Sequence, residues 1–456
     1  MEQKRSNFTG SLGFILAAAG SAVGLGNLWR FPYLAAKHGG GMFLLVYIIF
    51  AISFGFVMMV TEIAVGRKTR LSPMAAFGSL SKKWGWLGKL ATIIPMIILP
   101  YYCLIGGWVT RFLGTMVTGD LVASADGGNY FVGFISDLWT PLITFGIFLL
   151  ATTVIVLLGV NKGIEKLSRV LMPALVVIII ALTVVVLVQP GALEGVKYYL
   201  MPNIEDLSGK TILAALGQLF FSMSLAMGIM ITYGSYLEDN QHIEKATRHI
   251  ELFDTAIAML AGLLIVPAVF VFSGGDPAAL NKGPSLMFIT LPQVFNSMGP
   301  VLGTVVGALF FILVLFAAIT SSVSIMEAIV SGMVDKYPKL SRTKAIIICF
   351  IYALIIGVLC SLGYSVLSGV TIVPGMDILD SLDFLSNSVL MPIVGLFTCI
   401  FVGFVIKPQA IIDEIEKNGK FKMKGFYKFM IKWIAPIGII AILVSSVLEA
   451  FGVISY

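Results

Sequence analysis

The sequence predicts an all-α protein that crosses a membrane many times. Of its 456 residues, 58% are hydrophobic and 12% are charged, whereas soluble domains average about 25% charged residues. The hydrophobic residues form nearly continuous runs of about 20, the length that a helix needs to span a bilayer, while the strands of an outer-membrane barrel would alternate over about ten residues. These observations exclude a soluble enzyme and a membrane β-barrel.

The hydrophobic runs predict eleven membrane helices within a single transmembrane domain, residues 1–456. They lie near residues 12–36, 42–65, 88–114, 141–159, 166–188, 211–237, 253–273, 299–333, 343–362, 383–406 and 431–451. Of the 30 Lys and Arg residues, 24 lie in or beside segments that share a side with the N-terminus. Because cytoplasmic loops are rich in Lys and Arg, we expect a cytoplasmic N-terminus, an external C-terminus and a location in the cell membrane.

The charge and the cysteines indicate neither a nucleic-acid partner nor metal chemistry. The net charge of +6 is explained by membrane topology, and the lysines between 417 and 432 are interpreted as part of the same signal rather than as a lipid site. The four cysteines lie in apolar runs without a CxxC pair, and the three histidines form no H-E-x-x-H motif. Since no G-x-S-x-G motif occurs either, an intramembrane enzyme is not expected.

Two predicted helices contain segments that favour a break in the middle of the membrane. Gly20–Asn27 has three glycines in the first helix, and Phe221–Gly228 is rich in small and hydroxylic residues five helices later. Glycine also occurs at close helix contacts, but the matching positions favour an inverted five-plus-five repeat, approximately 12–188 and 211–406, followed by the eleventh helix. Unwound segments free carbonyl groups for a cation and helix N-termini for a carboxylate.

Polar groups in other helices add candidate ligands. Ala317–Ser322 carries hydroxyl groups that suit a hard cation, although such groups also bond the backbone of their own helix. Ionisable residues in membrane helices are costly and indicate function. Five such residues lie in or at the ends of apolar runs: Arg30, Glu62, Asp254, Glu327 and Asp383. Arg67 is a candidate partner of Glu62.

The segment Gly20–Pro32, which reads GSAVGLGNLWRFP, and the following Gly39–Gly41 closely resemble the neurotransmitter:sodium symporter family. The resemblance continues through further segments along the chain, namely Pro95–Tyr102, Gln218–Tyr236, Thr320–Glu327 and Asp380–Phe384. It implies a LeuT-like fold with broken first and sixth helices, of the bacterial eleven-helix type. It also implies sodium-coupled amino-acid transport by alternating access, without covalent chemistry.

The resemblance implies two sodium sites built from oxygen atoms. The first comprises the carbonyl of Ala22 and the side chains of Asn27, Ser222 and Asp254, together with the carboxylate of the substrate. The second joins the first and eighth helices through the carbonyls of Gly20, Val23 and Ala317 and the hydroxyls of Thr320 and Ser321.

The resemblance also implies an amino-acid pocket between the broken helices. Its residues would be Ser21, Ala22, Leu25, Gly26, Ile98, Tyr102, Phe221, Ser222, Ser224, Met227, Ser321 and Ile325, with the Tyr102 hydroxyl on the carboxylate. Monoamine transporters of the family carry an aspartate where this chain has Gly24, so an amino-acid substrate is expected. Met227 replaces the phenylalanine of some relatives, and its flexible thioether suits a hydrophobic or aromatic side chain.

Asp254 stands where chloride-dependent relatives use a neutral asparagine. Its carboxylate would supply the negative charge that chloride provides there, so chloride-independent transport is expected. Counting from Pro267 rather than Gly262 would place Phe253 at this position, but a phenyl ring cannot bind sodium. After sodium leaves, desolvation would favour protonation of Asp254, which makes proton counter-transport a further hypothesis.

By resemblance, Arg30 and Asp383 would form an outer gate above a lid of Tyr102 and Phe221. Arg5 and Asp335, near Tyr236, would close the cytoplasmic side. Family members unwind the fifth helix at the spacing seen here between Gly163 and Pro173 to hydrate the inner sodium site. A sodium-dependent amino-acid sensor without transport is the alternative; a channel is disfavoured because the breaks suggest a pocket that can be closed.

Overall fold

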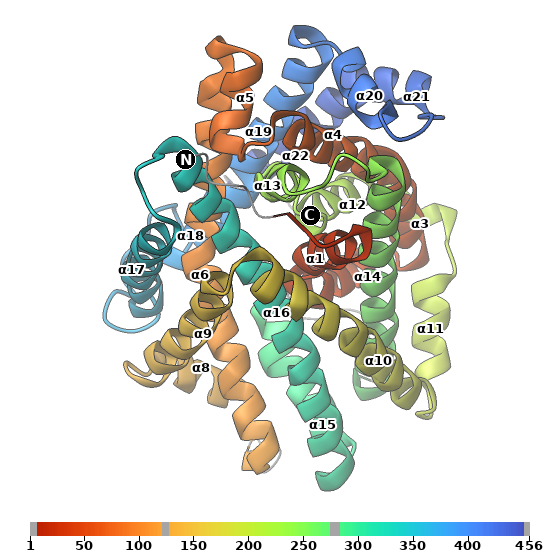
Figure 1. Cartoon of the computed structure of the whole chain (residues 1–456). Coiled ribbons are helices and arrows are strands. Elements are labelled where there is room, and N and C mark those ends of the chain that lie inside the picture. Colours follow the sequence, from red (N-terminus) through yellow and green to blue (C-terminus); the bar gives the residue numbers. More distant parts are fainter. Residues whose placement is uncertain (1–6, 121–126, 274–282, 451–456) are drawn as a thin grey trace.

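The computed structural model of the protein describes residues 7–120, 127–273 and 283–450. These parts of the chain are α-helical with short π- and 3₁₀-helical turns, and they contain no β-strand. Long helices pack into one bundle, and short helices cover its ends (Figure 1). The all-α class predicted from the hydrophobic runs is therefore confirmed.

Nine continuous spans in the described parts are long and apolar enough to cross a membrane. In chain order, with π- or 3₁₀-helical turns labelled η, their helices are α3 (Gly41–Phe50), η2 (Ala51–Gly55) and α4 (Phe56–Thr69); η3 (Lys82–Trp84) and α6 (Gly85–Thr118); α9 (Thr140–Leu157); η4 (Val160–Glu165) and α10 (Lys166–Leu187); α14 (Ile243–Ser273); α16 (Pro300–Lys336); α17 (Arg342–Leu362); α18 (Ile378–Asp383), η8 (Phe384–Leu390), α19 (Met391–Ile400) and η9 (Phe401–Val405); and α21 (Lys424–Phe429), η10 (Met430–Ile434) and α22 (Ala435–Ala450). Each coincides with one of the predicted runs.

The two remaining predicted spans are broken. The first consists of α1 (Ser11–Ala22), η1 (Gly26–Arg30) and α2 (Phe31–Lys37), and its halves are bent by 55°. The sixth consists of α12 (Gly209–Ser222) and α13 (Ile229–Ser235), with a non-helical segment between them. The breaks fall in the two segments that the small and hydroxylic residues indicated.

Seven short elements connect the spans: α5 (Pro73–Leu80), α8 (Gly127–Ser136), α11 (Ala192–Leu200), η5 (Ile204–Asp206), η7 (Leu286–Thr290), α15 (Leu291–Ser297) and α20 (Pro408–Glu416). Three of the α-helices have proline in their first turn, where its missing N–H costs no hydrogen bond. All are too short to appear as membrane-length apolar runs, so the hydrophobic pattern did not predict them.

The broken helices occupy the middle of the bundle. Figure 1 places α1, α12 and α13 at the centre of the view, with α6, α10, α14 and α16 around them. Every described residue of α13 is buried, whereas α9 and α10 present apolar side chains outward, such as Ile147 and Val177, which are 54% and 67% exposed. Outward apolar side chains suit lipid, so the interior is left for polar and irregular backbone.

Candidate functional site

The break in the first span leaves an extended residue between two helical pieces. Val23 has φ −69° and ψ 102°, although its N–H still donates to the carbonyl of Ala19 at 2.7 Å. The N–H of Gly24 donates to Oδ1 of Asn27 at 3.0 Å. The Asn27 side chain therefore satisfies a backbone donor that the break would otherwise leave unpaired in the membrane.

The break in the sixth span contains left-handed backbone. Ser224 and Ala226 have φ of 52° and 62°, a conformation that costs about 1–3 kcal/mol for a residue other than glycine. The N–H of Ala226 donates to Oε1 of Glu62 at 2.6 Å, and Oγ of Ser224 donates to the carbonyl of Ser21 at 3.1 Å. Glu62 thus holds this break in place, and the suggestion that it pairs with Arg67 is wrong.

Three side chains of the expected first sodium site meet between the two breaks. Nδ2 of Asn27 donates to Oγ of Ser222 at 3.0 Å and to Oδ1 of Asp254 at 2.8 Å, and Oγ of Ser222 donates to Oδ2 of Asp254 at 3.2 Å. All three side chains are buried, as is Ala22 at the end of α1. They offer amide, hydroxyl and carboxylate oxygens, the ligand types that a hard cation prefers.

The expected second sodium site brings α1 and α16 together. Oγ of Ser321 lies 3.3 Å from the carbonyl oxygen of Gly20, 3.1 Å from that of Ser21 and 3.2 Å from that of Val23. A hydroxyl donates only one hydrogen, so at least two of these carbonyls keep free lone pairs beside it. In the same helix, Oγ1 of Thr320 donates to the carbonyl of Phe316 at 2.9 Å and lies 3.2 Å from that of Ala317.

Most of the expected substrate residues surround the first break. The N–H of Leu25 donates to the Tyr102 hydroxyl at 3.4 Å. A Cβ atom at Gly24 would lie 3.0 Å from both the Tyr102 hydroxyl and Oγ of Ser321, and one at Gly26 would lie 2.5 Å from the Phe221 ring. Phe221 is half-buried, and the other expected pocket residues are buried.

The hydroxyl of Ser21 is a buried polar group without a protein partner among the described residues. Within the parts of the chain that the structure describes, Oγ of Ser21 accepts and donates no hydrogen bond, although Ser21 is 3% exposed. Buried polar atoms normally have partners. An unpartnered hydroxyl beside buried backbone carbonyls therefore suits a site that receives a polar ligand. Ile98, Met227 and Ile325 are buried as well, and their place in the pocket stays a prediction.

The two expected outer-gate residues each contact a different side chain. The Arg30 guanidinium lies over the Phe221 ring, with Cζ 5.2 Å from the ring centre. Oδ1 of Asp383 accepts a hydrogen bond from Nδ2 of Asn387 at 2.6 Å. Arg30 is thus stacked on the aromatic ring that the resemblance assigns to the lid, and the ion pair between Arg30 and Asp383 stays a prediction.

Arg5, which is expected in the inner gate, lies outside the described residues. Oδ2 of Asp335 accepts from the backbone N–H of Ser72 at 2.6 Å. The Tyr236 hydroxyl donates to Oε1 of Glu327 at 2.6 Å, and Arg342 forms an ion pair with the same carboxylate at 2.5 Å. Glu327, which had no assigned role, therefore links α16 to the end of α13 and to α17.

Comparisons with known proteins agree with this geometry. The model of the sodium:neurotransmitter symporter family matches residues 5–131 and 134–455. The chain belongs to this family. It is 36% identical to YhdH of Bacillus subtilis (strain 168), an uncharacterized sodium-dependent transporter, over all of both chains. An uncharacterized sodium-dependent transporter of Haemophilus influenzae (strain ATCC 51907 / DSM 11121 / KW20 / Rd) is 31% identical, with 97% of this chain and 98% of the relative aligned.

A crystal structure of MhsT in complex with L-phenylalanine matches with a TM-score of 0.87 and 37% identity, and the match covers 97% of this chain and 100% of that one. The LeuT-like fold is therefore confirmed. The protein is a multi-pass membrane transporter that depends on sodium, and its family and fold are those of secondary transporters rather than enzymes.

The sequence interpretation missed two polar side chains that contact the first span of this transporter or the residues just before it. Nε2 of Gln218 donates to the carbonyl of Gly26 at 3.1 Å, which also accepts from the N–H of Phe31, so Gln218 joins α12 to η1. Glu165 accepts from the N–H of Thr9 at 3.0 Å and pairs with Arg169 at 2.6 Å. Gln218 lies within a family-like segment, and Glu165 follows Gly163 by two residues, so proximity to a motif was the available signal.

The fifth span of the transporter is helical throughout its predicted break. The π-helical turn η4 contains Gly163, and α10 continues through Pro173. A Cβ atom at Gly163 would lie 2.1 Å from the carbonyl oxygen of Ile155, so the turn packs tightly on α9. Unwinding at this spacing stays a prediction.

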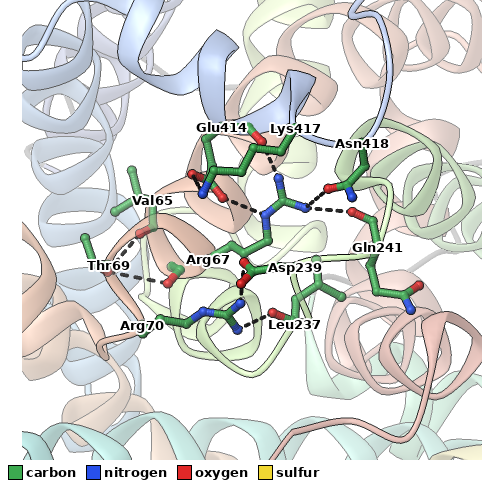
Figure 2. Close-up of polar contacts among 11 residues, drawn as sticks. Val65, Arg67, Thr69, Arg70, Leu237, Asp239, Gln241, Glu414, Lys417 and Asn418 are labelled. Carbon is green, nitrogen blue, oxygen red and sulfur yellow. Dashed lines mark hydrogen bonds and ion pairs between the residues drawn. The ribbon is translucent and has the colours of Figure 1, made fainter.

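A third missed feature is the cluster around Arg67, which joins α4, α20 and the loop after α13 (Figure 2). Arg67 is 1% exposed. Its Nε donates to Oε1 of Glu414 at 2.8 Å, and Nη1 donates to the carbonyl of Gln241 at 2.6 Å and to Oδ1 of Asn418 at 3.1 Å. Nothing local in the sequence relates residues so far apart along the chain.

Proposed function

We propose that this transporter is a symporter that imports a hydrophobic or aromatic amino acid with sodium, independently of chloride. The observation that carries the proposal is the buried contact of Asp254 with Asn27 and Ser222, between two broken helices. It places a carboxylate among neutral oxygen ligands, where a sodium ion would meet a compensating negative charge. The two sodium sites assigned by resemblance are part of the proposal.

The surroundings of Gly24 support an amino-acid substrate. A Cβ atom at Gly24 would press on the Tyr102 hydroxyl and Oγ of Ser321 at 3.0 Å, so glycine keeps both groups clear of a side chain and able to meet a group of the ligand. The Leu25 N–H and the Tyr102 hydroxyl are donors there, and donors suit a carboxylate. The buried side chains of Ile98, Met227 and Ile325 suit an apolar side chain, and the similar transporter MhsT was solved with L-phenylalanine.

Coupling would follow from alternating access. Sodium bound at the carbonyls of Gly20 and Val23 and at Ser321 would tie the first span to α16. Release of this sodium toward the cytoplasm would let α1, the inner half of the first span, move. The gates would be Arg30 with Asp383 outside, and Arg5 with Asp335 near Tyr236 inside. The repeats 12–188 and 211–406, the cytoplasmic N-terminus, the external C-terminus and the cell-membrane location belong to the same proposal.

A sensor that binds the amino acid without moving it is the weaker alternative. Both of the relatives described above are named as transporters, and each aligns over nearly its whole length. Such a sensor would bind phenylalanine in a sodium-dependent way but would not accumulate it inside vesicles, which separates the two functions in one preparation.

The test is uptake of labelled phenylalanine into proteoliposomes, with sodium or potassium outside and with chloride replaced by gluconate. The wild type should show saturable uptake that needs sodium and ignores chloride. The Asp254→Asn variant should either lose phenylalanine uptake or show uptake that depends on chloride. Glu251→Gln is the matched control, because Glu251 is a buried carboxylate on the same helix that faces Arg248 rather than the site; it should keep chloride-independent uptake.

Each contrary outcome removes one part of the proposal. Sodium-independent uptake in the wild type would contradict coupling. Chloride-dependent uptake in the wild type would contradict the role given to Asp254, and sodium-dependent binding without uptake would favour the sensor. Leucine and glycine used as competitors would test whether the pocket prefers a large apolar side chain.

A further inference from the structure

The segment that leads into the last helix has a basic face beside an aromatic face. Lys424, Lys428 and Lys432 recur every four residues in α21 and η10, so they lie along one side of the helix. Three aromatic residues follow helical spacing on the adjacent side and are exposed: Phe426 at 37%, Phe429 at 55% and Trp433 at 55%. Aromatic rings next to lysines are typical of the boundary between membrane and water.

The neighbouring span extends this aromatic face. Phe404 of η9 is 51% exposed, and its ring centre lies 6.0 Å from that of Trp433. Nζ of Lys432 lies 5.8 Å from the centre of the same Phe404 ring. The lysine stem therefore runs along an aromatic surface while its charge stays near the end of the span, as snorkelling lysines do.

The three carboxylates of the neighbouring α20 have partners other than Lys428 and Lys432, and Asp413 accepts from the Gln409 amide at 2.7 Å. Glu414 pairs with Arg67 and Lys417 (Figure 2), and Glu416 pairs with Lys424 at 2.7 Å. Among the residues that the structure describes, no carboxylate forms an ion pair with Lys428 or Lys432. These two ammonium groups thus keep their positive charge available beside a lipid-facing aromatic surface.

We propose that Lys428 and Lys432, with Phe404, Phe429 and Trp433, form a docking surface for an anionic phospholipid. The phosphate of the headgroup would lie between the two ammonium groups, and the glycerol and upper acyl chains would pack on the three rings. This goes beyond the transport function and does not depend on it. A lipid is favoured over free phosphate because only a lipid can cover the exposed aromatic rings.

The experiment maps a photoactivatable phosphatidylglycerol onto the full-length protein in vesicles of phosphatidylcholine. The reactive group sits near the headgroup, and labelled peptides are quantified by mass spectrometry. Labelling should concentrate on residues 426–433, should exceed that by the matching phosphatidylcholine probe several-fold, and should fall several-fold in K428Q/K432Q. The matched control is K339Q/K344Q, which removes one exposed lysine from the connection between α16 and α17 and one from the first turn of α17, and should label as the wild type does.

Equal labelling by both probes would show that the surface does not select an anionic headgroup. An equal loss in the two double variants would show that the lysines act only through net charge. Either result would overturn the proposal. Excess inorganic phosphate should leave the labelling unchanged; displacement by phosphate would assign the site to a free anion instead. Helical circular dichroism and elution as a single species verify that each variant is folded. Trp433→Leu should weaken labelling while both lysines remain, which tests the aromatic face separately.

Discussion

Asn27 and Asp254 are 227 residues apart in the chain, and a hydrogen bond of 2.8 Å from Nδ2 to Oδ1 joins their buried side chains. Oδ1 of the same Asn27 side chain accepts a hydrogen bond from the N–H of Gly24. One side chain therefore connects the broken backbone of the first span to the carboxylate of α14. A ligand that changes the charge at Asp254 would act directly on the geometry of the break, because no solvent lies between them to screen it.

The Tyr102 hydroxyl is predicted to contribute to amino-acid affinity. Tyr102→Phe removes the group that accepts the Leu25 N–H and faces Gly24. Since a hydrogen bond to a charged group contributes about 1.5–3 kcal/mol, the dissociation constant for phenylalanine should rise by roughly ten- to a hundredfold. Equilibrium binding of labelled phenylalanine to purified protein measures this.

Tyr101→Phe is the matched control for this prediction. The neighbouring Tyr101 hydroxyl faces Ser386 and Asn387, at 3.3 Å from each, rather than the broken first helix. Removal of the Tyr101 hydroxyl should change phenylalanine affinity by no more than about twofold, because a group that does not touch the ligand contributes little binding energy. Similar losses in both variants would contradict the assignment of Tyr102 to the carboxylate.

The absence of a side chain at Gly24 is predicted to select for substrates that carry their own carboxylate. In Gly24→Asp the Cβ atom lies 3.0 Å from the Tyr102 hydroxyl, so the new carboxylate would occupy the space left for that of the amino acid. Phenylalanine binding should be lost, whereas phenethylamine, which lacks a carboxylate, should become the better competitor.

Gly24→Ala separates the effect of charge from that of volume. It adds the same Cβ atom without a carboxylate, so it should weaken phenylalanine binding without favouring the amine. Competition assays with the two ligands on both variants provide the readout. Unchanged phenylalanine binding in Gly24→Asp would show that the pocket lies elsewhere.

The broken helices were predictable because their cause is local. Gly20, Gly24 and Gly26 weaken the first helix within seven residues, and the structure breaks it at Val23. The residues of the sodium and substrate sites came from motif resemblance, since nothing in the spacing of Asn27, Ser222 and Asp254 brings them together. The fold supplies that proximity.

Other contacts could not be predicted because their partners are distant or are backbone groups. Glu62 was expected near Arg67, but it binds the N–H of Ala226, a donor that exists only because the sixth helix is unwound. Arg67 instead pairs with Glu414 on α20, a helix too short to appear in a hydrophobic pattern. Burial of both charges follows from tertiary packing, which local patterns do not encode.

The buried ion pair of Arg67 and Glu414 is predicted to be important for stability. Both side chains have 0% relative exposure, and removal of one partner from a buried pair costs about 3–5 kcal/mol because the other charge is left uncompensated. Glu414→Gln should therefore clearly lower the thermal unfolding temperature in detergent.

Asp239→Asn is the control, because it breaks the ion pair between Arg70 and Asp239, whose side chains are 36% and 73% exposed respectively. Exposed pairs contribute about 1 kcal/mol or less. A comparable shift in the two variants would argue against the buried pair as a structural anchor.

His38, in the connection between α2 and α3, is predicted to make stability depend on pH. Burial, together with the positive charges of Lys37 and Lys210, lowers the pKa of His38 from 6.5 to about 4. The folded state therefore keeps the ring neutral, while the unfolded chain takes up a proton below pH 6.5, so the unfolded state binds more protons. The stability that the neutral His38 ring contributes is complete above pH 6.5 and is lost as the pH falls toward 4.

The thermal unfolding temperature, measured from pH 6.5 down to pH 4, should fall less steeply in His38→Gln than in the wild type. His249→Gln, which replaces an exposed histidine, should keep the wild-type slope, and equal slopes in all three proteins would show that His38 already ionises freely in the folded state.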